Sequence, residues 1–155
     1  MENKISFIAV LLLFVSCNSL VEKKDTKSTK TAIEGTWKLL TGTLIEKGDT
    51  VIADYTKGKE FIKIINDTHF AFLSHDLSKG KNADSLFSAG GGNYSLNDSS
   101  YTERLVYCND RQWEGNEFHF IVNIGDDTLT QKGIEKIDSL GVNRVNIEKY
   151  VRVKD

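Results

Sequence analysis

Short runs of alternating apolar and polar residues recur along most of this chain, and turn-forming residues separate them. The runs are 36–45, 50–55, 60–65, 68–74, 93–96, 101–108, 117–124, 128–132 and 145–153. Gly, Asn and Asp fill the connections, and the chain contains no proline. Many short strands joined by such turns predict an all-β antiparallel sandwich or barrel. Residues 76–89 and 134–141 show only irregular or weakly helical patterns, so we expect them to be connections.

The N-terminal segment differs from the rest of the chain and resembles an export signal. Lys4 precedes an apolar stretch at 5–15, and the segment ends in Val15-Ser16-Cys17. This stretch is too short to span a bilayer as a helix, which takes about 20 apolar residues, but it has the form of a secretory signal. The small residue before Cys17 resembles a bacterial lipobox, which implies that Cys17 is lipidated and becomes the mature N-terminus. A signal peptide that merely contains a cysteine remains the alternative.

These features divide the chain into three parts. Residues 1–16 form the predicted lipoprotein signal peptide, 17–32 the lipidated cysteine with a polar, flexible tether, and 33–155 one folded domain. The formal net charge of −2 provides no basic face, so we expect no nucleic-acid partner. With Cys17 lipidated, Cys108 has no internal disulfide partner. We interpret Cys108 as a small core side chain, with a reactive thiol as the alternative.

Several motifs of the domain, taken in their order along the chain, resemble one family. They are Gly35-Thr36-Trp37, Thr68-His69-Phe70, the glycine-rich run at 90–96, Tyr101-Thr102-Glu103, the turn at 125–130 and the closing Arg152. The domain is similar to the lipocalin-like (calycin) domain of unknown function found in exported lipoproteins of Gram-negative bacteria. The resemblance implies an antiparallel up-and-down lipocalin-like β-barrel of about eight to ten strands. It also implies barrel closure by Gly35, Trp37 and Arg152, with the guanidinium packed on the face of the indole.

Polar and aromatic residues on the predicted strands are the candidates for a ligand site. In a barrel, alternate residues point inward, and an inward-facing polar set can orient a small ligand. The candidates for ligand binding are His69, Tyr94, Tyr101, Glu103, Tyr150 and Arg152. Two alternatives stay open, because the alternation along each strand does not show which of its two faces points inward. The same residues can form a structural ion-pair network, or they can face outward.

The sequence offers no motif for a metal, a cofactor or catalysis. His69 and His75 are about 20 Å apart on one strand, so they cannot share a tetrahedral ion there, and we expect no metal site. The glycine run at 90–92 lacks the Lys-Ser/Thr of a phosphate-binding loop, so we interpret it as a bend or bulge where backbones approach closely. No Ser-His-Asp or Cys-His spacing is present, and we expect neither a cofactor nor an enzymatic activity.

Taken together, these features predict a lipid-anchored, ligand-binding barrel of the cell envelope, at the outer membrane of a Gram-negative bacterium. The expected partners are a small amphipathic or hydrophobic molecule in the barrel interior and a membrane, reached through the N-terminal lipid. Trp37 and Arg152 would close one end of the barrel, and residues 76–92 would border the open end. The alternative is a non-enzymatic accessory protein that binds another envelope protein through the barrel surface.

Overall fold

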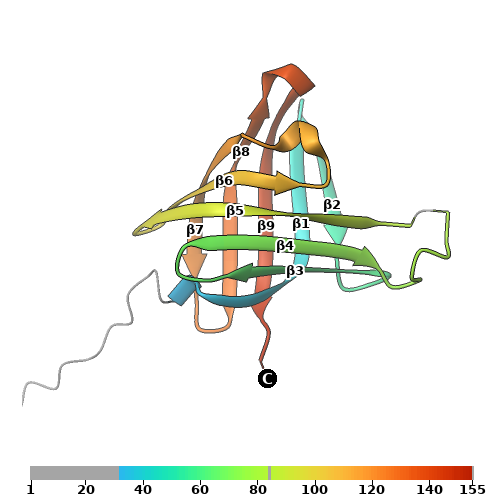
Figure 1. Cartoon of the computed structure of the whole chain (residues 1–155), viewed down its shortest axis with the longest axis horizontal. Helices are drawn as coiled ribbons and strands as arrows, with labels where there is room; N and C mark the ends of the chain where they lie inside the picture. The colour runs from blue at the N-terminus through green and yellow to red at the C-terminus, as the bar shows by residue number, and fades with distance from the viewer. Residues whose placement is uncertain (1–31, 84, 155) are drawn as a thin grey trace, which may run out of the picture.

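The computed structural model describes residues 32–83 and 85–154, which form a β-barrel (Figure 1). Its strands are β1 (Gly35–Glu46), β2 (Asp49–Asp54), β3 (Lys59–Ile65), β4 (His69–Asp76), β5 (Phe87–Asn97), β6 (Ser100–Cys108), β7 (Glu117–Ile124), β8 (Thr128–Ile137) and β9 (Val142–Arg152). Two 3-10 turns, η1 (Arg111–Trp113) and η2 (Asp138–Leu140), interrupt the connections. The predicted signal peptide, Cys17 and most of the tether lie outside the described residues. Within the described ranges, no helix is long and apolar enough to cross a membrane.

The barrel closes because β1 pairs with both ends of the sheet. Each strand from β3 to β9 pairs antiparallel with the next, and β9 pairs back with β1. The start of β1 pairs with β3, and its second half pairs with β2, which is thus an extra strand beside the closed eight-stranded barrel. In Figure 1, β3 to β6 cross in front of β1 and β7 to β9. This confirms the predicted all-β, antiparallel up-and-down barrel.

Alternate residues of the eight barrel strands point into the barrel interior. In β7, Phe118, Phe120 and Val122 are buried, whereas His119 and Ile121 between them are exposed. This follows from the pleat of a strand, which sends successive side chains to opposite faces. The apolar residues on one face of the strands therefore meet in one interior core.

The glycine run lies inside β5, which begins at Phe87 and so is longer than the sequence predicted. The pairing of β5 with β6 shifts register between Gly91 and Gly92, and Val106 of β6 is the extra residue. A Cβ at Gly92 would lie 1.9 Å from the carbonyl oxygen of Arg104, so no side chain fits there. The predicted bulge with close backbone approach is confirmed. The connection expected over residues 76–89 is shorter than predicted, because Phe87 already pairs with β4.

Trp37 and Arg152 meet at one end of the barrel. Trp37 is fully buried, and its Nε1 donates a hydrogen bond to the carbonyl of Ile33 at 2.7 Å. The guanidinium carbon of Arg152 lies 4.0 Å from the centroid of a Trp37 ring. Its terminal nitrogens donate to the carbonyls of Glu34 and Ala32 at 2.7 and 2.6 Å. A partly desolvated cation–π contact of this kind stabilises by about 1 kcal/mol or more.

Gly35 permits this closure for two reasons. Its φ of +135° is a conformation that residues with a side chain rarely adopt, and a Cβ there would lie 2.6 Å from Nη1 of Arg152. A side chain at residue 35 would therefore strain the backbone and displace the guanidinium from the indole.

Candidate functional site

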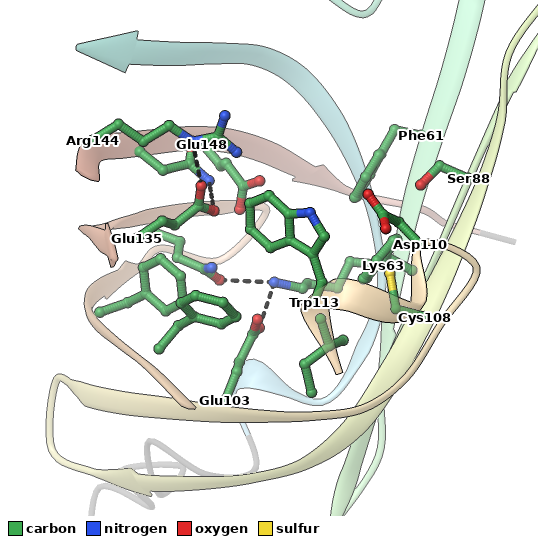
Figure 2. A pocket seen from close by; sticks show the side chains of 16 residues that line it. Phe61, Lys63, Ser88, Glu103, Cys108, Asp110, Trp113, Glu135, Arg144 and Glu148 are labelled. Carbon is green, nitrogen blue, oxygen red and sulfur yellow. Dashed lines mark hydrogen bonds and ion pairs between the residues drawn. The ribbon is translucent and has the colours of Figure 1, made fainter. Parts of the chain in front are cut away.

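A partly enclosed cavity of about 300 Å³ lies in the barrel interior (Figure 2). Its apolar and aromatic walls are Phe61, Phe72, Leu105, Cys108, Trp113, Phe118 and Phe120. Its polar lining is Lys63, Ser88, Glu103, Asp110, Gln131, Glu135, Arg144, Asn146 and Glu148. Ligand sites in proteins are commonly concave and mostly apolar, with a few placed polar groups, and their volumes start at about 300 Å³. The cavity therefore has the size and composition of a small-molecule site.

Lys63 of β3 is the charged centre of the interior. The residue is 3% exposed, and its Nζ donates hydrogen bonds to Oε1 of Glu103 at 2.5 Å and to Oε1 of Gln131 at 3.0 Å. Three aromatic rings surround Nζ, with centroids 5.5 to 5.8 Å away: Phe70, Tyr101 and Tyr150. A buried ammonium needs such partners, because leaving it unpaired away from water costs several kcal/mol.

Burial has the largest effect on the pKa of Glu103, the partner of Lys63. Loss of water around the Glu103 carboxylate raises its pKa above the usual value, while the Lys63 ammonium opposes the rise. The Glu148 carboxylate adds to it by like-charge repulsion. Burial also raises the pKa of Tyr101 far above its ordinary value, with Glu103 as the next cause. Tyr101 is therefore a neutral phenol, and Lys63 is the group that favours the charged form of Glu103 against the effect of burial.

Glu148 of β9 is a second carboxylate of the cavity wall. The hydroxyl of Tyr150 donates to its Oε2 at 2.8 Å. Burial, followed by the charge of Glu148, raises the pKa of Tyr150 well above its ordinary value, so that this hydroxyl keeps its proton and acts as a donor. Figure 2 shows the Glu148 carboxylate pointing into the cavity, which Trp113 also lines.

Glu135 of β8 lies on the strand that pairs with β9 and organises the neighbouring part of the wall. Its Oε2 accepts a hydrogen bond from Nε of Arg144 at 2.7 Å, and its Oε1 accepts one from Nδ2 of Asn146 at 2.7 Å. Arg144 lies over Trp113, with its guanidinium carbon 5.3 Å from the ring centroid. These contacts orient the arginine and hold the indole against the cavity.

Trp113 reaches the cavity because the β6–β7 connection folds back on the barrel. Asp110 caps η1 by accepting from the amide of Gln112, and the amide of Gly115 donates to the carbonyl of Leu105 at 2.8 Å. The Trp113 ring then packs 6.0 Å from that of Phe118. This connection lies at the barrel end opposite to the Trp37–Arg152 closure, as does the β4–β5 connection that follows Asp76.

The residues that the sequence predicted to bind a ligand lie in different parts of the barrel. Glu103 lines the cavity, whereas Tyr101 and Tyr150 are fully buried in the core beside Lys63. Tyr94 is half-buried near the closed end, where its hydroxyl donates to the carbonyl of Asn66 at 2.8 Å.

Arg152 belongs to the closed end rather than to the cavity. His69 lies on the outer face, because the neighbouring Phe70 faces the core. It therefore does not line the interior cavity.

Several cavity residues were not candidates, among them Lys63, Trp113, Gln131 and Arg144. The sequence did contain an indication for Lys63, because it alternates with Phe61 and Ile65 on one face of an apolar run. A lysine on the apolar face of a strand is expected to point into the core, where its charge needs an acidic partner. Trp113 carried no such signal, because it lies in a connection whose folding depends on contacts with β6 and β7.

In the described part of the chain, no group of three or more His, Cys, Asp and Glu side chains could hold a metal ion. Comparisons with known proteins do not extend the description. No protein-family model matches the chain, and neither curated proteins nor solved structures give a match. The class that the fold and the cavity define is a closed, eight-stranded antiparallel barrel whose interior can hold a ligand.

Proposed function

We propose that this protein is a lipocalin-like binding protein of the cell envelope, which takes up a small amphipathic or hydrophobic molecule in its barrel. The observation that carries this proposal is the cavity of about 300 Å³ with aromatic walls. A barrel packed solid by its side chains would leave no room for cargo. Here five aromatic side chains border open space, and burying a ligand's apolar surface against them is favourable by about 25 cal/mol per Å².

The role that we propose is binding rather than catalysis. Four charged groups of the cavity form two ion pairs that position side chains, Lys63 with Glu103 and Arg144 with Glu135. Such pairs suit the orientation of a bound molecule. We further propose that lipidation of Cys17 tethers the barrel to a membrane, so that ligand is captured or released near the membrane surface.

Binding of the neutral probe N-phenyl-1-naphthylamine tests the proposal. Its fluorescence should rise on titration with the wild-type protein, because the probe moves from water into an apolar cavity. Ser88→Trp, which places an indole in the cavity lining, should abolish the rise. Ser95→Trp is the matched control, since Ser95 lies on the same strand and is exposed. It should bind the probe like the wild type.

Two results would contradict the proposal. One is a folded wild-type protein that neither binds the probe nor carries a small molecule in native mass spectra when purified from its own host. The other is equal probe binding by the two tryptophan variants, with circular dichroism showing that both are folded.

A second candidate function is the binding of another envelope protein through the barrel surface. The observation that favours it is an apolar strip on the outer face of β3 to β5. Ile62 and Leu73 are directly paired across β3 and β4, and Phe87 lies beside Leu73 with 68% of its surface exposed. Native mass spectrometry of protein from its own host distinguishes the two candidates. A stable protein partner without a small molecule would favour the second.

A further inference from the structure

Two of the carboxylates that line the cavity are neutralised by cations of the lining itself. Glu103 pairs with Lys63 at 2.5 Å, and Glu135 pairs with Arg144 at 2.7 Å. Both cations of the lining are thereby engaged. The carboxylates that remain therefore give the cavity an excess of negative charge.

Glu148 is the remaining carboxylate inside the barrel. It accepts a hydrogen bond from the Tyr150 hydroxyl at Oε2, but among the described residues none donates to Oε1, and none forms an ion pair with it. Figure 2 shows no dashed line from Glu148 to Arg144 or Lys63. The other carboxylate, Asp110, lies at the rim, is exposed and caps η1. Among the described residues of the lining, Glu148 is therefore a half-buried carboxylate without a paired cation, and its Oε1 has no hydrogen-bond donor.

The apolar part of the cavity also favours a positive charge. The face of an aromatic ring carries negative electrostatic potential and attracts cations within about 6 Å. Trp113 already accepts Arg144 in this way. The Glu148 carboxylate points into the cavity that Trp113 also lines (Figure 2), and the rings of Phe61 and Phe72 stack in the same cavity with centroids 5.7 Å apart. A carboxylate in a cavity with aromatic walls is a suitable environment for an alkylammonium group.

We propose that the cavity is selective for an amphipathic organic cation, with its ammonium group on Oε1 of Glu148 and its apolar part against the aromatic walls. This inference rests on the proposed ligand-binding function and specifies the class of ligand. An ammonium supplies the donor that Oε1 lacks and neutralises the excess charge. An anionic ligand would instead bring a further negative charge into a lining that already holds four carboxylates and two cations.

Displacement of N-phenyl-1-naphthylamine by three probes of equal chain length tests this inference. The probes are octylammonium, octanol and octanoate at pH 7, which differ mainly in the charge of the head group. Octylammonium should displace the fluorophore at about tenfold to hundredfold lower concentration than octanol, because a hydrogen bond to a charged group stabilises by that factor. Octanoate should be the weakest competitor.

Two variants assign the preference to Glu148. In Glu148→Gln, octylammonium should lose its advantage over octanol, while octanol should compete as in the wild type, which shows that the cavity is intact. Glu117→Gln removes an exposed carboxylate of β7 that pairs with Arg104, and it should keep the preference.

The results separate this inference from the function on which it rests. If octanol competes but octylammonium has no advantage, or if octanoate competes best, the selectivity for cations is overturned and ligand binding stands. The inference is also overturned if Glu148→Gln keeps the full preference. If neither the fluorophore nor any probe binds, both proposals fail.

Discussion

At the scale of single residues, the interior depends on one buried lysine. Lys63 donates to Glu103 and Gln131, residues that lie 40 and 68 positions away in the chain. The two hydrogen bonds link β3 to β6 and β8 across the barrel. Buried pairs of this kind add little net stability over apolar packing, but removing one partner is costly, because it leaves a charge without a counterion.

Replacing Lys63 with methionine should therefore lower the free energy of unfolding at pH 7 by about 3–5 kcal/mol. The loss should be smaller at pH 5. Without the ammonium, the folded-state pKa of Glu103 rises further above the unfolded value of about 4.3. The free energy of unfolding of the variant therefore falls as pH rises from the unfolded pKa to the folded-state pKa. Urea unfolding of Lys63→Met and the wild type at the two pH values measures both effects.

A double variant is the control for this mechanism. Lys63→Met with Glu103→Leu removes both charges, so it should recover most of the stability and lose the extra pH dependence. An equal loss in the single variant at pH 5 and pH 7 would show that Glu103 is not responsible.

At the scale of elements, the connection between β4 and β5 is organised by one carboxylate. Oδ1 of Asp76 accepts hydrogen bonds from the Ser78 hydroxyl and the Gly80 amide, and Oδ2 accepts one from the Leu86 amide at 3.0 Å. These bonds, that of Ser78 foremost, lower the pKa of Asp76 to about 2. Because the folded-state pKa is lowered, the contribution of Asp76 is present above the unfolded value and is lost as pH falls towards 2.

Asp76→Ala should loosen this connection while the barrel stays folded. The amides of Gly80 and Leu86 lose their acceptor, so their hydrogen exchange at neutral pH should become roughly five- to tenfold faster. Short-pulse hydrogen–deuterium exchange with mass spectrometry measures this difference. Asp49→Ala, at an exposed position that starts β2, is the control and should leave both amides unchanged. Unchanged protection in Asp76→Ala would contradict the proposed role of the carboxylate.

At the scale of the whole molecule, the proposed function requires that a membrane tether leave the cavity of the barrel accessible. Trp37 and Arg152 close the barrel end near the start of the described domain, and the cavity lies beyond the core residues that pack on them. A tether that leaves from the closed end would therefore not cover the mouth. This arrangement suits capture of a ligand near a membrane.

Cys17→Ala should move the protein from the membrane fraction to the soluble fraction of its own host, because the variant lacks the acceptor of the lipid. Cell fractionation with detection by antibody measures this, and mass spectrometry of the wild-type N-terminus should find an acylated Cys17. Cys108→Ala is the matched control and should stay with the membrane. A wild-type protein that is soluble and begins with unmodified residues would contradict lipid anchoring.

Much of the fold could be predicted from local sequence, because strands and turns are encoded by neighbouring residues. Alternation marked a part of every strand, and the glycines at 90–92 marked the bulge, but residues 87–89 of β5 and 134–137 of β8 were expected to be connections and are strand. The inward face was harder to predict. Tyr107 shares the sequence parity of Glu103 and Leu105, but the bulge at Val106 inserts one residue and turns Tyr107 outward, where it is 69% exposed. A shift of one residue reverses every later side chain of a strand.

The amino-acid sequence by itself determined the all-β character, the presence of each strand, most of the turns and the candidate anchor at Cys17, since each depends on a short stretch of chain. Only the tertiary structure decided that Lys63 meets Glu103 and that Glu148 faces the cavity with one free oxygen. Those contacts join strands far apart in the sequence, and they exist because β1 and β9 close the sheet in one register. Closure is a property of all the strands together, so no single run of residues encodes it.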